Sequence, residues 1–253
     1  MILQSRILVF LAPLLIGGIM EFALVYPDKV FPFFSLLCML GVVVFSVITK
    51  RPRQSEQFIF FLNALLFNIS ALAFIYFIQG ELYRHIIIAG VTALNVIYLH
   101  HLFNYHFRTD RYQLNALQNV SSYINLSSAF TGSAVLFSLI IYLAWPAWTT
   151  TIILWALATL LSFQTTWMHK IKFSTSMYFA LISGLVLTEV YWVVSFLPSS
   201  FLVNALIVTV VYYAMVNIGR YYLSGRIHRA VIIRYFVISV TVLVLTVVTA
   251  RWV

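Results

Sequence analysis

Nine long apolar runs constrain the fold of this chain more than any other feature of its sequence. About 20 helical residues cross the ~30 Å of hydrocarbon in a bilayer, and each run is long enough to do so. Of the 253 residues, 63% are apolar and only 8% are charged, too few charges to cover a water-exposed globular surface. The sequence therefore predicts an all-α polytopic membrane protein, one transmembrane domain of about nine helices with no soluble domain. The expected spans are 7–26, 30–49, 57–79, 86–104, 119–143, 147–168, 177–197, 200–219 and 231–250.

The connections between these runs alternate between short ones and longer, basic ones. With the N-terminus inside the cell, twelve of the 15 Lys and Arg residues lie on the cytoplasmic side. Only Lys29, Arg84 and Arg251 then lie outside. Cytoplasmic loops of membrane proteins carry such an excess of positive charge. The sequence therefore predicts a cytoplasmic N-terminus and an external C-terminus.

Two glutamates fall inside expected spans and are the first candidates for a binding site. Glu189 lies near the middle of the 177–197 run, and Glu21 lies toward the outer end of the first run. A carboxylate in hydrocarbon is costly, so it usually faces the bundle interior and has a partner or a proton. Thr188 and Trp192 lie beside Glu189 and share this hypothesis of an ion- or substrate-binding site. The alternative is a protonated carboxyl that hydrogen-bonds to a neighbouring helix.

The run 119–143 is the most polar of the nine, and Asn125 lies within it. Its polar face indicates either hydrogen bonds between helices or a water-accessible path on the cytoplasmic side. Asn63, Asn68 and Asn95 in two other runs are candidates for the same polar interior.

Histidines near the cytoplasmic ends of the runs raise the question of a metal. His101 and His106 are five residues apart, rather than the four that place two ligands on one helix face. His106 and Asp110 are four residues apart and could bind one metal together if that segment is helical, but the spacing of the set as a whole is poor for a metal site. The sequence therefore predicts neither a metal nor another cofactor, and the alternative role of these imidazoles is contact with lipid headgroups.

Four arginines follow the eighth run or begin the ninth, and they are candidates for binding an anionic lipid. These residues are Arg220, Arg226, Arg229 and Arg234. Basic clusters beside spans bind phosphate headgroups, and they also set topology without binding a specific lipid. Both readings stay open from the sequence.

The C-terminal third resembles a known group of proteins. The run from Glu189 to Pro198, the pairs Tyr212-Tyr213 and Gly219-Arg220, and the closing Thr249–Trp252 carry the resemblance. Over about residues 185–252 they are similar to an uncharacterised family of multi-pass membrane proteins from candidate-phyla bacteria. The resemblance implies a bacterial cytoplasmic (inner) membrane and no particular activity.

Two functions from different classes fit these observations. The first is a small transporter or channel-like protein with an intramembrane acidic site. The second is a non-catalytic membrane subunit or scaffold that binds lipid or a partner membrane protein. An enzyme is disfavoured because no set of nucleophile, base or metal ligands is evident. The expected partners are the bilayer, anionic lipids at its cytoplasmic face and a protein partner or second copy, but not nucleic acid.

Overall fold

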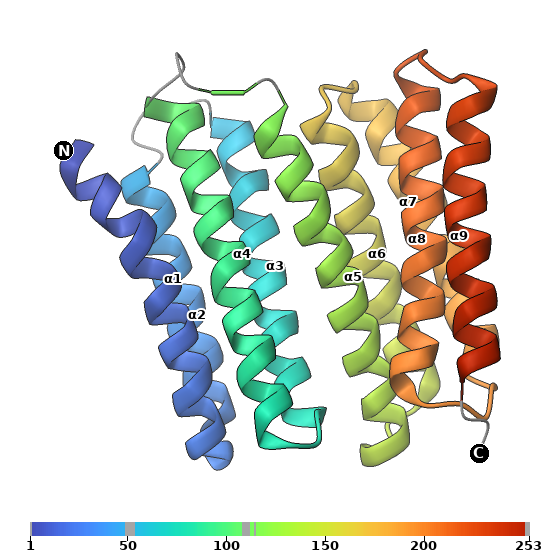
Figure 1. Cartoon of the computed structure of the whole chain (residues 1–253), viewed down its shortest axis with the longest axis horizontal. Helices are drawn as coiled ribbons and strands as arrows, with labels where there is room; N and C mark the ends of the chain where they lie inside the picture. Colours follow the sequence, from blue (N-terminus) through green and yellow to red (C-terminus); the bar gives the residue numbers. More distant parts are fainter. Residues whose placement is uncertain (1, 49–53, 108–111, 114, 251–253) are drawn as a thin grey trace. The chain divides into compact units, whose positions relative to one another are not determined.

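The computed structural model describes residues 2–48, 54–107, 112–113 and 115–250, and in these ranges the chain forms α-helices joined by short connections, with no strand (Figure 1). The helices are α1 (Ile2–Val25), α2 (Val30–Ile48), α3 (Gln54–Phe77), α4 (Glu81–Phe107), α5 (Ala116–Leu143), α6 (Ala147–Met168), α7 (Phe173–Val194), α8 (Phe201–Leu223) and α9 (Arg229–Thr249). A short 3₁₀ helix, Pro27–Lys29, joins α1 to α2.

Nine helices in the described ranges are long and apolar enough to cross a membrane, as the sequence predicted. These helices indicate a multi-pass membrane protein. Their ends differ from the apolar runs because backbone hydrogen bonds continue into polar residues. Helix α7, for example, begins at Phe173 rather than at residue 177 and ends at Val194. Glu189 therefore lies about one and a half turns from the end of its helix, not near the middle.

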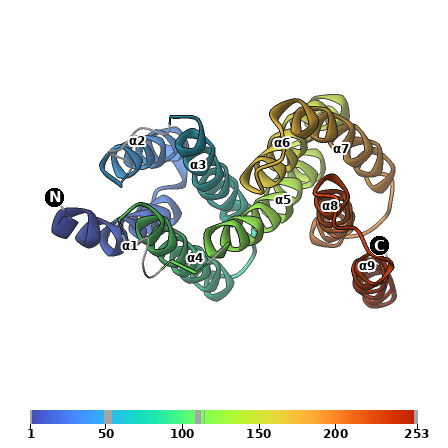
Figure 2. The ribbon, with the colours of Figure 1, turned by 90° about the horizontal axis from the view of Figure 1, so that it is seen from above.

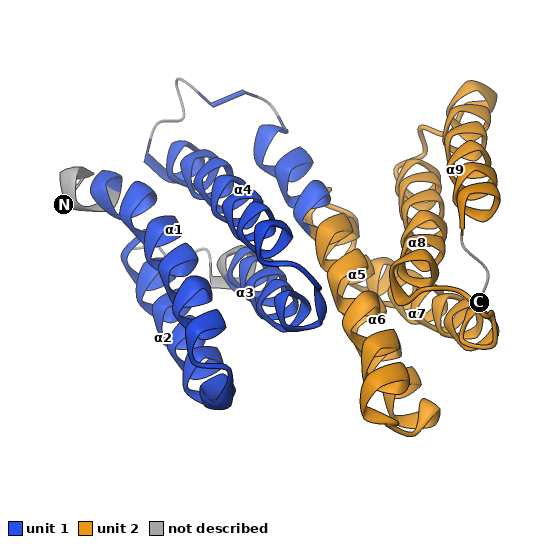
Figure 3. Cartoon of the chain, turned by 60° about the horizontal axis from the view of Figure 1, so that its bottom comes forward, with its two compact units in different colours: residues 1–124 blue, residues 125–253 orange. Residues whose placement is uncertain are grey.

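The helices group into two compact units, and the division of the chain between them falls within α5, after Ile124 (Figure 3). Unit 1 covers Met1–Ile124. In it α1 packs against α2 and α4, and α3 packs against α2 and α4 (Figure 2). The hydroxyl of Tyr76 donates to the carbonyl of Ala23 at 3.2 Å, and that of Tyr98 donates to the carbonyl of Phe60 at 2.8 Å. Polar bonds thus link α3 to both α1 and α4.

Unit 2 covers Asn125–Val253, and its closest helix pair is α6 with α7. A β-carbon at Gly184 of α7 would collide with the hydroxyl of Thr159 on α6. The glycine therefore lets the two backbones approach, which is how small residues serve helix packing in membranes. Helix α8 packs against α6, α7 and α9, whereas α9 is exposed along most of its length.

Candidate functional site

The cations of unit 2 gather where α6 and α8 end and where α7 and α9 begin. We call this region the basic end of unit 2; it comprises Lys170, Lys172, Arg220, Arg226, Arg229 and Arg234. Two helix caps shape it. Lys170, with φ of 61°, closes α6, and Gly225, with φ of 65°, closes α8. In each cap the amide of the left-handed residue and the amide of the residue after it donate to carbonyls of the last helical turn, so the chain turns sharply out of both helices.

Arg220 is held at the basic end by His169, a contact between the ends of α8 and α6. The imidazole Nδ1 lies 2.7 Å from the carbonyl oxygen of Thr165, which can only accept, so Nδ1 carries the proton. Nε2 is then an acceptor, and Arg220 Nη1 donates to it at 2.9 Å. The same guanidinium lies 5.0 Å over the ring of Tyr221. Arg220 therefore meets an imidazole and an aromatic ring, and neither of these neutralises its charge.

The protonation of His169 follows from these neighbours. Burial lowers the pKa of His169, the bond to the Thr165 carbonyl opposes that shift, and the positive charge of Arg220 lowers it further. A neutral imidazole is what the hydrogen bond from Arg220 requires. His169 was not predicted for this role, because its Thr165 partner is a backbone carbonyl that any residue four positions earlier would supply.

Within unit 2 no acidic side chain lies near the basic end. Glu189 is the sole acidic residue in the sequence from 125 to 253, and it lies on α7 near the opposite end of that helix. From Lys172, which precedes α7, to Glu189 the helix rises by about 25 Å. The cations at the basic end thus have no acidic partner within unit 2.

Glu189 and its two neighbours lie on different parts of the α7 surface. The Glu189 side chain is exposed and makes no hydrogen bond or ion pair with any residue in the described ranges. Trp192 is also exposed, one turn further along. Thr188 is half-buried, and its hydroxyl donates to the carbonyl of Gly184 at 2.7 Å. The structure therefore places Glu189 and Trp192 together on the outer face of α7 and directs Thr188 to its own helix.

Asn125 is fully buried and links three helices of unit 2. Its Nδ2 donates to the hydroxyl of Thr165 on α6 at 2.9 Å. That hydroxyl lies 3.4 Å from the hydroxyl of Tyr212 on α8. This is the geometry expected of hydrogen bonding between helices, the first of the two roles considered for the polar run.

Glu21 meets His85 across the α1–α4 contact of unit 1. The imidazole Nδ1 lies 2.9 Å from the carboxylate, and the two side chains are 55% and 42% exposed for His85 and Glu21. They border an open pocket of about 440 Å³. Small residues make up part of its lining: Gly17 and Gly18 from α1 and Ala89 and Ala93 from α4. Glu21 stood out in the sequence, but its imidazole partner, 64 residues away along the chain, did not.

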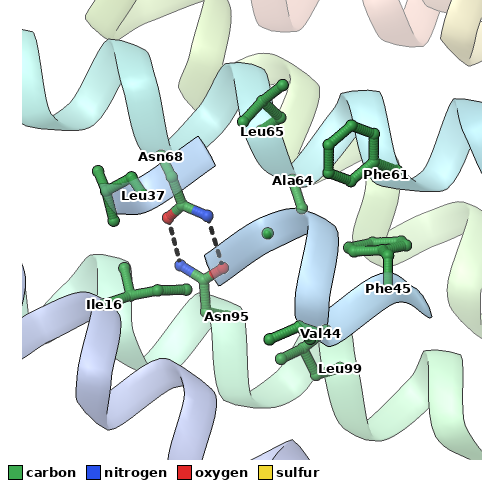
Figure 4. Close-up of a pocket in the computed structure, with 11 residues that line it drawn as sticks. Ile16, Leu37, Val44, Phe45, Phe61, Ala64, Leu65, Asn68, Asn95 and Leu99 are labelled. Carbon is green, nitrogen blue, oxygen red and sulfur yellow. Dashed lines mark hydrogen bonds between the residues drawn. The ribbon is translucent and has the colours of Figure 1, made fainter. Parts of the chain in front are cut away.

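A second polar group of unit 1 is sealed inside it (Figure 4). Asn68 of α3 and Asn95 of α4 exchange two amide hydrogen bonds, of 3.2 and 2.8 Å. Asn95 also donates to the carbonyl of Val91 at 2.9 Å. The cavity beside the pair measures only about 20 Å³. This site ties two helices together and is too small for an organic ligand.

The metal candidates lie along and beyond the end of α4. His101 and His106 are both half-buried on that helix, and Asp110 lies outside the described residues. His106 stacks edge-on against Tyr105 at 5.2 Å, and His101 does so against His100 at 5.9 Å. Within the described ranges no group of three or more His, Cys, Asp or Glu side chains is placed to hold a metal ion.

Comparison with known proteins adds a family likeness without an activity. Residues 128–249 match a family described as a protein of unknown function, DUF5656. The matched segment lies within unit 2, and it includes Glu189 and the whole basic end. No curated protein and no solved structure matches the chain.

Proposed function

We propose that this chain is a non-catalytic subunit or scaffold of a bacterial cytoplasmic membrane that binds anionic lipid headgroups at the basic end of unit 2. The observation that carries the proposal is the gathering of six cations at one end of a unit whose single acid lies about 25 Å away. With the N-terminus in the cytoplasm, the basic end meets the cytoplasmic leaflet. Anionic lipids give that leaflet a negative surface potential, which attracts basic segments.

The chemistry of the basic end suits a phosphodiester. A guanidinium presents several N–H donors in a plane that matches phosphate oxygens. Only one nitrogen of Arg220, Nη1, donates to His169, so its other N–H groups can donate to a phosphate. Helices α7 and α9 begin here, so the free amide groups of their first turns are further donors for an anion. Each Lys or Arg near an anionic surface contributes about 1 kcal/mol to binding.

The test is lipid retention by the purified protein. The full chain is reconstituted in bilayers of phosphatidylcholine with a minor share of phosphatidylglycerol, extracted in mild detergent, and its bound lipids are measured by native mass spectrometry. We expect phosphatidylglycerol to be enriched over its share in the bilayer. The triple variant Arg220→Gln, Arg226→Gln, Arg229→Gln should lose most of that enrichment, while the control Arg84→Gln in unit 1 should keep it. Equal enrichment in the triple variant and the control would overturn the proposal.

A second candidate function, a small transporter or channel-like protein, is favoured by the Glu21–His85 pair. An imidazole 2.9 Å from a carboxylate, at an open pocket within two membrane-spanning helices, is suited to exchanging a proton. In proteoliposomes with an internal pH dye, an imposed pH gradient should then decay faster than in protein-free vesicles. Glu21→Gln should abolish the difference and Glu81→Gln should not; decay equal to that of protein-free vesicles excludes proton transport.

A further inference from the structure

The outer face of α7 carries a regular seam of exposed side chains. Its members follow one another at alternating intervals of four and three residues: Tyr178, Ile182, Leu185, Glu189, Trp192 and, in the turn after the helix, Phe196. We call these six residues the α7 seam. Such spacing keeps side chains in one line along a helix and is the pattern by which two helices pack side by side. Ile182 is 65% exposed, and on the opposite face of the helix Ala180 is fully buried.

Apolar members of such a seam can face lipid without cost, but Glu189 cannot. Acidic residues within membrane spans face a bundle interior or a water-filled cavity, or they pair with other groups. Glu189 has no partner in the described ranges. Side chains on a helix lean toward its N-terminus, so Glu189 leans toward the middle of α7 and away from the nearer end. A second membrane-embedded protein surface packed against the α7 seam would shield Glu189 from lipid and could give it a hydrogen-bond partner.

We propose that the α7 seam is the interface of a homodimer, in which two copies of this chain pack their α7 helices in parallel and join their Glu189 carboxyls. A protonated carboxyl both donates and accepts a hydrogen bond, so two of them facing each other across a twofold axis satisfy one another completely. The depth of Glu189 is the same in both copies. This complementarity with itself is why the observations favour a second copy over an unrelated helix, which would need its own polar group at that depth.

The rest of the seam fits the same arrangement. Ile182 and Leu185 supply aliphatic contact on one side of the carboxyl pair. Trp192 and Phe196 lie edge-on to each other at 5.9 Å on the other side. Aromatic rings at the end of a span anchor it at the lipid headgroups and close the dimer against water. The inference does not depend on lipid binding at the basic end, which lies at the other end of α7.

Disulfide trapping in native membranes tests the interface. Cys38 is the chain's single cysteine, so Cys38→Ser gives a background without thiols. Ile182→Cys is then compared with Val237→Cys on α9, a matched control that is also exposed and lies at a similar distance from the start of its helix. Under mild oxidation we expect a band of twice the chain's mass for Ile182→Cys and not for Val237→Cys. Equal trapping at both positions, or a band of a different mass at Ile182, would overturn the homodimer.

The role of the carboxyl is tested by energy transfer between labelled copies of the full chain in liposomes at graded dilution. Glu189→Gln keeps a donor and an acceptor and should dimerise like the wild type. Glu189→Leu should weaken the dimer about fivefold, which corresponds to about 1 kcal/mol. Thermal unfolding in detergent shows whether each variant keeps its fold. A folded Glu189→Leu that dimerises as tightly as the wild type would remove the carboxyl pair from the proposal.

Discussion

At the scale of single residues, the Asn68–Asn95 pair offers a direct measure of what a buried polar contact contributes here. Replacing either residue by Leu leaves the other amide without its partner, and we expect each single variant to lose about 1–3 kcal/mol of stability. The double variant, in which neither amide remains, should lose less than the two single losses combined. Thermal unfolding in detergent measures all three, and strictly additive losses would contradict the reciprocal bonding.

His169 should make stability depend on pH. Its pKa is lowered in the folded protein, so between that value and the ordinary value near 6.5 the unfolded chain binds more protons. His169 therefore leaves the free energy of unfolding unchanged above about pH 6.5 and lowers it as the pH falls below that value. Protonation also removes the acceptor of Arg220 and puts a cation beside it. We expect the melting temperature to fall more between neutral pH and about pH 5 in the wild type than in His169→Gln. Parallel pH profiles would contradict this assignment.

Individual polar residues were predictable from the sequence, but their partners were not. The asparagines in the apolar runs stood out because polar groups in a membrane need hydrogen bonds. Which amide meets which depends on helix rotation and neighbours, and hydropathy reports neither. The partners of Glu21 and Arg220 were missed for the same reason, since His85 and His169 are 64 and 51 residues away along the chain.

At the scale of helices, the α6–α7 contact depends on Gly184. Gly184→Ala would press its methyl group against the hydroxyl of Thr159 and toward the Trp155 carbonyl, 3.2 Å away. We expect a loss of about 1–3 kcal/mol, as for other overpacked sites. Thr159→Ala removes that hydroxyl, which has no hydrogen-bond partner within the described residues, so it should cost little alone and should restore part of the stability to Gly184→Ala. Equal melting temperatures for Gly184→Ala with and without Thr159→Ala would contradict the close approach.

Helix positions were predictable to within a few residues, and helix ends were less so. The apolar runs located the nine helices because insertion energy is close to a sum over residues. The ends depend instead on capping bonds. The Schellman cap of α8 at Gly225 lies six residues beyond the expected end of that span at 219. Because α7 begins and ends earlier than the expected span, Glu189 lies nearer to the end of its helix than to the middle. Hydropathy does not show which side of a helix is exposed, so the exposure of Glu189 was not predictable.

At the scale of the whole molecule, the number of long apolar helices in the described ranges followed from the apolar runs, whereas the grouping into two units did not. Grouping depends on which helices carry small or polar residues on matching faces, as α6 and α7 do at Thr159 and Gly184. Whether the chain acts as a single transmembrane domain stays a prediction, as does its orientation. The likeness to DUF5656 coincides with unit 2, the part that contains both the basic end and the α7 seam.

The one-sided charge of unit 2 has a consequence in any membrane that carries a voltage. Moving one positive charge from the negative to the positive side costs about 2.3 kcal/mol for each 100 mV. If the unit were inserted the other way up, all six cations at the basic end would move to the positive side. Its one acid, Glu189, lies near the opposite end of α7 and would move to the negative side, so it would not offset that cost. If α6 to α9 enter the bilayer with their cations on the negative side, the resting voltage of a living cell therefore opposes any later inversion of this unit.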